Sequence, residues 1–286
     1  MVKLFVSFLL SVVVLSALEN QFTLDGVESY DDPVIAKIKT FIDEKTYTNN
    51  EDFIRVIFDP KSAYYIKDRV DAVKIIQTLK DNGLLKLFFK SPQEFTLNFK
   101  TNGYPIFFVR IMDDTLRSIG YFRYVTSASH LDASEFSWSI KLVSEYLTDP
   151  LILQNELNKS GCEIVDVTRN NAKEWTFTID MDEGHLNLPK LENAKKVELR
   201  RSLYAHWFNV SEIRGLNINS SRRNHWYPYI AYYDASLHLV KLLKRDRVYK
   251  KISLVIPKNA KYMKISDLYT LKNVRDGLIL HPLGSR

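Results

Sequence analysis

The chain has 286 residues, of which 45% are hydrophobic and 26% are charged, with only nine glycines. This composition is typical of a folded globular protein and excludes collagen-like, disordered and small disulfide-rich chains. Residues 1–189 carry 20 Lys and Arg against 27 Asp and Glu, whereas residues 190–286 carry 20 against 7. We therefore expect a domain boundary near Pro189 and different partners for the acidic and basic parts.

The first residues, MVKLFVSFLLSVVVLSALEN, have the layout of a secretory signal. Lys3 precedes an apolar run from Leu4 to Leu15, and the small residues Ser16 and Ala17 follow it. The run is too short to span a bilayer comfortably, so the pattern predicts a signal peptide over residues 1–17 and export to the periplasm or the medium. A retained N-terminal anchor is the alternative. No later segment is apolar enough to cross a membrane.

Cys162 is the single cysteine. It cannot form an intramolecular disulfide, so we expect stability to come from packing and the thiol to be buried at the start of a strand. Such cysteine usage in an exported protein favours a bacterial periplasm.

Residues 18–66 contain two stretches with helical character, DPVIAKIKTFI and NEDFIRVIF. We expect them to form an N-terminal helical cap on the segment that follows.

A repeated pattern follows the cap. EFTLNF begins at Glu94, EFSWSI at Glu135 and EWTFTI at Glu174, and each alternates large apolar with small polar residues, which predicts a half-buried strand. Before each strand comes a Leu, three mostly polar residues and a Gly, in TLKDNGLL, TLRSIGYF and ELNKSGCE. A helix ending at a glycine fits this pattern, because glycine adopts the left-handed conformation at little cost.

The three expected helices are visible in the spacing of apolar residues and in their caps. One stripe consists of Phe108, Ile111, Met112, Thr115 and Leu116, and a second of Val70, Val73, Ile76 and Leu79. Asp149 can cap the third helix, with Pro150 in its first turn.

Hairpin turns are expected at KSPQ, SASHLDAS and RNNAK. The spacing between Glu94, Glu135 and Glu174 is regular and has the length of one supersecondary unit. We therefore predict αββ modules at residues 67–104, 105–146 and 147–189. Chance similarity between common αββ arrangements is the alternative.

The order helix, hairpin, helix, hairpin over residues 67–182 resembles the strings of αββ modules in bacterial envelope machines, such as POTRA modules and the periplasmic modules of secretins. The resemblance rests on topology and on no signature motif. It implies modules that bind other proteins and do not catalyse reactions.

Residues 190–286 contain short alternating runs separated by turn residues. The runs are SLYAHWFNVS, LNINSS, WYPYIAYYD, SLHLVKLLKRD, KKISLVIP, AKYMKISDLYTL and DGLILHP. Their spacing predicts an antiparallel β-sandwich. The fold class is therefore α+β: three tandem αββ modules followed by a basic, aromatic-rich β-sandwich.

SSRRNHWYPYIAYYD is the densest aromatic and cationic stretch of the chain. Aromatic faces beside cations suit stacking on sugars or binding of anionic polymers. The candidate ligand-binding residues are Arg222, Arg223, His225, Trp226, Tyr227, Tyr229 and Tyr232. The alternative is a half-buried aromatic strand flanked by snorkelling arginines. Nucleic acid would fit the charge, but an exported protein seldom meets it.

Signals for catalysis are absent from the sequence. DMDEGH contains Asp180, Asp182, Glu183 and His185, but it lacks a metal loop's spacing and is expected to be a solvated turn. No phosphate-binding glycine loop, nucleophile elbow or HExxH motif occurs. We expect no catalytic residue, no metal and no cofactor.

These patterns together predict a non-enzymatic, exported scaffold or binding protein of a bacterial cell envelope. The αββ modules would dock envelope proteins, and the C-terminal domain would contact an anionic or glycan surface such as peptidoglycan. Two alternatives remain: an envelope carbohydrate-active enzyme with carboxylates contributed from distant positions, and a peripheral lipid-binding protein.

Overall fold

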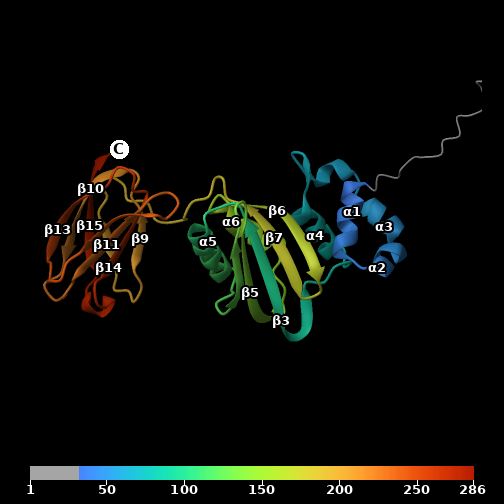
Figure 1. Cartoon of the computed structure of the whole chain (residues 1–286), viewed down its shortest axis with the longest axis horizontal. Coiled ribbons are helices and arrows are strands. Elements are labelled where there is room, and N and C mark those ends of the chain that lie inside the picture. The colour runs from blue at the N-terminus through green and yellow to red at the C-terminus, as the bar shows by residue number, and fades with distance from the viewer. Residues whose placement is uncertain (1–31) are drawn as a thin grey trace, which may run out of the picture.

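A computed structural model describes residues 32–286 of the chain. The expected signal peptide, residues 1–17, and the first part of the expected helical cap lie outside the described residues. The fold is mixed α+β, with short helices at one end, a five-stranded sheet in the middle and an all-β part at the other end (Figure 1). Within the described part no helix is both long and apolar enough to span a membrane.

The described part of the cap is helical and covers one edge of the five-stranded sheet. It comprises α1 Pro33–Phe41, α2 Glu44–Asn49, α3 Glu51–Ile57 and a 3-10 turn at Lys61–Tyr64. The Asp32 carboxylate accepts a hydrogen bond from the Val34 amide and starts α1. α1 lies against β6 (Glu163–Asn171), where Lys37 pairs with Asp166 at 2.5 Å and the Arg169 guanidinium donates to the Phe41 carbonyl.

Three further helices follow: α4 Ala72–Asp81, α5 Pro105–Ser118 and α6 Pro150–Asn158. Their buried faces match the expected stripes, with one correction. Val70 does not belong to α4; it lies in β2 (Arg69–Val70), which pairs with β1 (Tyr65–Ile66), because Asp71 caps α4 by accepting from the Lys74 amide. The Asp149 cap and the Pro150 start of α6 are confirmed.

The three helix-ending glycines adopt equivalent conformations. Gly83, Gly120 and Gly161 have φ values of 75°, 100° and 65°, in the left-handed region. The residue after each glycine donates its amide to the leucine carbonyl five positions earlier, at 2.9 Å for Leu84, 2.8 Å for Tyr121 and 3.1 Å for Cys162. This is a Schellman ending, which explains why the sequence repeats Leu, three residues and Gly.

The strands of the three repeated segments pair in one sheet rather than in three. The strands are β3 Phe88–Thr101, β4 Val125–Leu131, β5 Phe136–Tyr146, β6 and β7 Glu174–Asp180, in the order β4-β5-β3-β7-β6. β3 is antiparallel to β5 and parallel to β7. The three similar strands β5, β3 and β7 are therefore neighbours at the centre of the sheet.

The alternation in these central strands separates a buried face from a polar face. Phe99 packs between Trp138 and Phe177, with ring centroids 5.8 and 5.9 Å away. α4, α5 and α6 contribute to the same buried cluster. On the opposite face Asn98 donates to Glu174 at 3.0 Å and accepts from Ser139 at 2.7 Å. The expected half-buried strands are confirmed.

Two of the three expected hairpin turns need correction. KSPQ is not a turn: it lies inside β3, where the register with β5 shifts between Phe88 and Gln93, so the chain bulges without reversing. SASHLDAS is mostly strand β4, and only residues 132–135 form the connection to β5. The turn after Asn171 is present, between β6 and β7.

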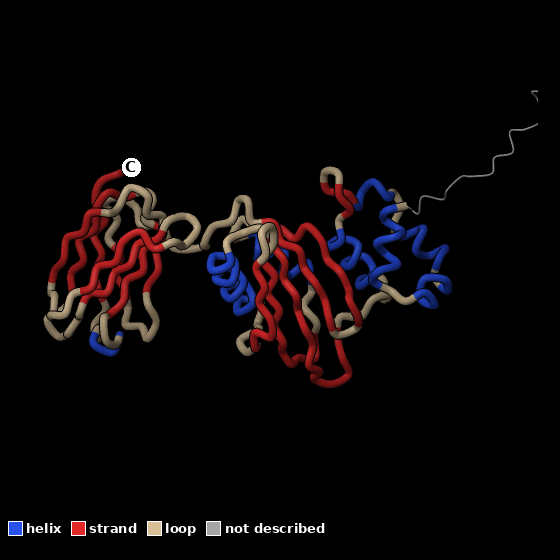
Figure 2. The backbone as a smooth tube through the Cα atoms, viewed as in Figure 1, coloured by secondary structure: helices blue, strands red, loops and turns tan. Residues whose placement is uncertain are grey.

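The part after Pro189 contains two four-stranded antiparallel sheets, and its only helical element is a 3-10 turn at Leu271–Asn273 (Figure 2). The sheet orders are β13-β10-β15-β8 and β12-β11-β14-β9. The strands are β8 Val197–Leu199, β9 His206–Asn209, β10 Ile213–Ser220, β11 Pro228–Tyr233, β12 Leu239–Lys244, β13 Lys251–Val255, β14 Tyr262–Asp267 and β15 Leu278–Ser285. Each of the seven expected runs contains one strand, and β8 is additional. Both sheets contribute to one hydrophobic cluster.

A short junction joins the two parts. Tyr262 of β14 is fully buried within the core formed by the five-stranded sheet and its helices. Its hydroxyl accepts a hydrogen bond from the Leu186 amide at 2.9 Å. Tyr104 meets the ring of His238 edge-on, at a centroid distance of 5.1 Å. One end of the sheet β12-β11-β14-β9 therefore packs against the sheet-and-helix part.

Candidate ligand-binding face

The expected candidate residues do not form one site, because strand β11 directs alternate side chains to opposite faces. Trp226 is fully buried and donates its indole N–H to the Ser266 carbonyl at 2.9 Å. Tyr232 is buried in the same core, and burial raises the pKa of its hydroxyl. Both rings fill the core and are not available to a ligand.

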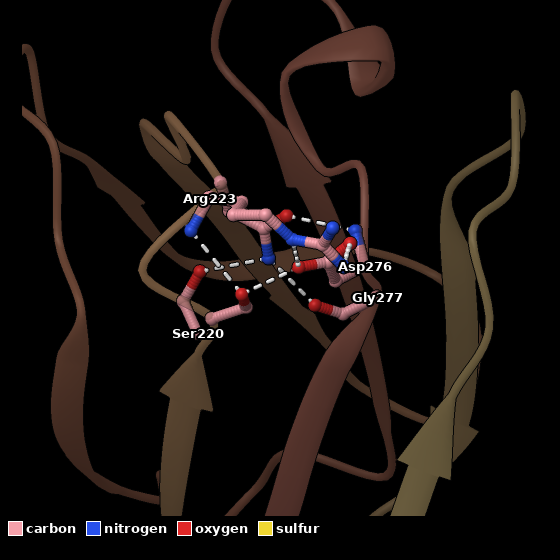
Figure 3. Close-up of polar contacts among 6 residues, drawn as sticks. Ser220, Arg223, Asp276 and Gly277 are labelled. Atoms are coloured by element: carbon pink, nitrogen blue, oxygen red, sulfur yellow. Dashed lines mark hydrogen bonds and ion pairs between the residues drawn. The ribbon is translucent and has the colours of Figure 1, made fainter.

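Arg223 belongs to a structural network that closes the end of β10 (Figure 3). Its guanidinium donates to both carboxylate oxygens of Asp276, at 2.8 and 2.9 Å. The neighbouring Asn224 is fully buried, donates to Ser220 Oγ at 3.1 Å and to the Gly277 carbonyl at 2.7 Å, and accepts from the Asp276 amide at 2.9 Å. The turn holds the ends of β10 and β15 together.

The remaining candidates lie on the surface in separate environments. Arg222 and His225 are exposed, and His225 uses its backbone amide to reach the Asn273 carbonyl. Tyr227 is half-buried and meets Tyr269 edge-on at 5.1 Å. Of the seven candidates, only Tyr229 lies among other rings and beside cations that form no ion pair in the described part of the chain.

Tyr229 lies on the outward face of the sheet β12-β11-β14-β9. Its neighbours along β11, Pro228 and Ile230, are buried, whereas Tyr229 is half-buried. Lys244 of β12 is its register partner, and Lys264 of β14 is the partner of Ala231, the next residue of β11 on the same face of the sheet. The pleat therefore brings two lysines from neighbouring strands to one tyrosine.

The lysines lie over ring faces. The Lys264 ammonium is 5.6 Å from the ring centroid of Trp207 and 6.0 Å from that of Tyr229, and the Lys244 ammonium is 5.6 Å from Tyr229. Trp207 in turn stacks on Tyr233 at 5.1 Å with an interplanar angle of 28°. We call these five residues, Trp207, Tyr229, Tyr233, Lys244 and Lys264, the basic-aromatic face.

The electrostatics of this face are dominated by its lysines. Neither Lys244 nor Lys264 forms an ion pair within residues 32–286. Burial raises the pKa of Tyr233, which keeps its phenol neutral. Arg110 of α5 adds a further cation at 5.7 Å from the Trp207 ring, but it is paired with Asp114 at 3.1 Å. The face offers ring surfaces and two uncompensated positive charges.

Four members of the face were not among the candidates from sequence. Trp207, Lys244 and Lys264 lie on three different strands, and only the register brings them together. The only signal for this face in the sequence is the alternation of side chains along a strand. It places Tyr229 and Tyr233 on one face of the strand and Tyr232 on the other. Pairing of β11 with β14, across about thirty residues of chain, has no local signal.

The acidic cluster lies in an exposed turn and the cysteine is buried. Asp182, Glu183 and His185 are exposed in a turn, and His185 Nδ1 contacts the Glu183 carbonyl at 3.1 Å. Within the described part, no group of three or more His, Cys, Asp and Glu side chains could hold a metal ion. Cys162 is buried as expected, and burial raises the pKa of its thiol to about 12, which keeps it protonated.

No protein-family model, curated protein or solved structure matches the chain.

Proposed function

We propose that the protein is an exported, non-enzymatic component of a bacterial cell envelope that holds an anionic glycan on its basic-aromatic face. In this proposal residues 67–189, namely α4 with β3 and the two αββ units 105–146 and 147–189, dock protein partners, and residues 190–286 are a β-sandwich. The observation that carries the glycan assignment is the position of Lys264, which lies near the rings of both Trp207 and Tyr229 and has no carboxylate partner among residues 32–286.

The chemistry of such a face matches an acidic sugar better than a simple ion. The lysines that lie over the half-buried rings can turn to pair with carboxylates of a glycan, which leaves apolar ring surface for the C–H faces of its sugars. A free inorganic anion would use the lysines and leave the rings without a role. The muropeptides of peptidoglycan carry both sugar rings and carboxylates.

Binding of soluble muropeptides by the chain lacking residues 1–17 tests this proposal. Replacing Lys244 and Lys264 together by Gln is expected to weaken binding about tenfold, since each exposed charge pair contributes up to about 1 kcal/mol. The matched control replaces Lys251 and Lys258 by Gln, because both are exposed cations of the same part outside the face. Equal loss in both double variants would mean that only net charge matters, and would contradict the assignment.

Anionic lipid is the alternative that a specific observation supports. Leu239 and Leu242 on β12 are 55% and 36% exposed, next to the exposed Lys241 and Lys244. Such a combination suits a membrane surface. Liposomes containing anionic lipid, tested beside the muropeptides, separate the two ligands: tight, steeply salt-dependent liposome binding without muropeptide binding would replace the glycan with a membrane.

The protein-docking part of the proposal has its own test. Envelope extract is passed over the immobilised chain and over its residues 190–286 as a comparison. We expect protein partners that require residues 67–189. Recovery of no such partner would remove this part of the proposal and leave the glycan part intact.

A further inference from the structure

Strand β5 is longer than its neighbour β4, which leaves part of β5 without a partner on one side. β4 pairs with β5 only from Phe136 to Lys141, where Lys141 faces Val125. β5 continues to Tyr146 and keeps its pairing with β3 on the other side. Every second residue of Leu142–Tyr146 therefore directs its backbone N–H and C=O groups away from β3, and in the described part of the chain no strand pairs with them there. Tyr146 has side-chain partners instead: its N–H donates to Ser144 Oγ at 3.0 Å and its C=O accepts from the Tyr121 hydroxyl at 3.2 Å.

A groove runs along this unpaired stretch. Two adjoining pockets of about 560 and 470 Å³ share Ile119, Tyr121 and Tyr146. The first is lined by Leu142, Val143 and Ser144 on one side and by the loop after α5 on the other. The second extends the groove over the ends of α4 and α6 and is lined mainly by leucine, isoleucine and aromatic side chains. We call the two pockets the β5 groove.

The rim of the β5 groove exposes large apolar side chains. Phe122 is 71% exposed, Val143 and Tyr146 are each 65% exposed, and Phe88 is 54% exposed. Apolar side chains grouped in this way around a hollow are typical of a binding site rather than of ordinary surface.

Among the residues that line the β5 groove, the charges without an ion-pair partner in residues 32–286 are positive, whereas Glu145 on the same stretch of β5 is an exposed carboxylate outside the lining. Lys80 is neutralised by Asp149 at 2.6 Å. Lys86 and Arg123, which line the two pockets, are exposed and form no ion pair within residues 32–286. An occupant that carries carboxylates is therefore favoured over a neutral or basic one.

The opposite edge of the same sheet is protected. β6 is covered by α1 and held by the contacts of Lys37 and Arg169. A protein that covers one sheet edge and leaves the other edge unpaired beside an apolar groove presents a template for strand addition.

We propose that the β5 groove binds an extended segment of a partner protein as an added strand along Leu142–Tyr146. The segment has bulky apolar side chains at alternate positions, which enter the groove, and acidic residues between them, which pair with Lys86 and Arg123. This inference rests on the protein-docking part of the proposed function and names its surface and the chemistry of its partner.

The probe is a labelled nine-residue peptide, Glu-Val-Thr-Phe-Glu-Val-Thr-Phe-Glu, added to the chain lacking residues 1–17. Two control peptides carry Lys in place of Glu, or N-methyl groups on alternate amides. We expect saturable binding of the probe, binding at least tenfold weaker for the Lys peptide, and none for the N-methylated peptide, which cannot complete a ladder. Amide exchange at residues 142–146 slows when the probe binds.

Arg123→Glu combined with Lys86→Glu is expected to weaken probe binding about tenfold or more. The matched control is Lys45→Glu combined with Lys258→Glu, two exposed cations outside the groove, which should change binding less than twofold. Both target residues are exposed, so the variants keep the fold. Equal binding by all variants, or binding of the N-methylated peptide, would overturn the proposal.

Two results without peptide would also overturn it. Protection of residues 142–146 that grows with protein concentration would identify a second copy as the occupant. Protection that is lost when residues 18–31 are removed would identify the chain's own N-terminal segment. If envelope partners are recovered equally well by the double variant, docking remains and the β5 groove is excluded as its surface.

Discussion

Trp226 and Tyr229 lie three residues apart and have different roles. Trp226 fills the core, whereas Tyr229 lies outward with lysines from two other strands. The sequence places both rings in one dense aromatic stretch. It cannot show which ring is buried and which faces outward, because that depends on where strand β11 begins. Once the start at Pro228 is known, the alternation assigns Tyr229 and Tyr233 to one face and Ile230 and Tyr232 to the other.

Asn224 gives the clearest stability prediction at the residue scale. Asn224→Ala is expected to lower the free energy of unfolding by about 2–3 kcal/mol, because it leaves the buried Gly277 carbonyl and the Asp276 amide without partners. Urea unfolding measures the change. Arg223→Ala is the comparison, since it removes an exposed ion pair to the same Asp276, and a loss as large as that of Asn224→Ala would contradict the role of the buried amide.

The burial of His206 leads us to expect that the chain loses stability as the pH falls. Burial lowers the pKa of its imidazole, so the folded chain binds this proton less readily than the unfolded chain. The stability contributed by the uncharged His206 is therefore complete above the ordinary histidine pKa. It is lost as the pH falls through the interval between the pKa of His206 in the unfolded chain and its lower pKa in the folded chain. Urea unfolding of His206→Gln should show a smaller loss of stability between pH 7.5 and pH 5.5 than unfolding of the parent chain, and an equal loss would contradict this role of His206.

At the scale of elements, the helix endings were predictable and the sheet was not. Leu, three residues and Gly specify a Schellman ending through local hydrogen bonds, so Gly83, Gly120 and Gly161 follow from sequence. The alternation in β3, β5 and β7 likewise gave the buried faces. Which strands are neighbours depends on contacts across long stretches of chain, and the parallel pairing of β3 with β7 has no local pattern.

We expect alanine substitution to destabilise the chain by different amounts at the three helix-ending glycines. Gly83→Ala and Gly120→Ala are expected to cost about 1–2 kcal/mol each, since a left-handed residue with a Cβ is strained and no atom lies within 4 Å of the new Cβ. Gly161→Ala should cost more, because its Cβ would meet the Glu183 carbonyl oxygen at 2.3 Å and His185 Nδ1 at 2.9 Å. Melting temperatures of the three variants give the ranking, and a Gly161→Ala variant no less stable than the other two would refute it.

At the scale of the whole molecule, the change of charge near Pro189 coincides with the change from a sheet covered by helices to two sheets without helices. The sequence shows that charge and periodicity shift together there. It could not place the junction, where Tyr262 of the basic part is buried in the core of the acidic part. The basic-aromatic face begins beside this junction, since Tyr233 packs against the same core.

The junction has a simple test. Tyr262→Phe removes the acceptor of the Leu186 amide, so exchange of that amide with solvent should rise about tenfold, the equivalent of one hydrogen bond. The amides of β3 serve as an internal control and should keep their rates. Unchanged exchange at Leu186 would mean that the hydrogen bond does not hold the two parts together.

The central claim is that an anionic glycan lies on the basic-aromatic face, and an NMR titration of the isotope-labelled chain with soluble muropeptides tests it most directly. The account predicts that the indole N–H signal of Trp207 and the amides of Tyr229 and Lys264 shift most, and that all three saturate at one concentration. Saturable shifts confined to another surface of residues 190–286, or no shifts at saturating muropeptide, would contradict it.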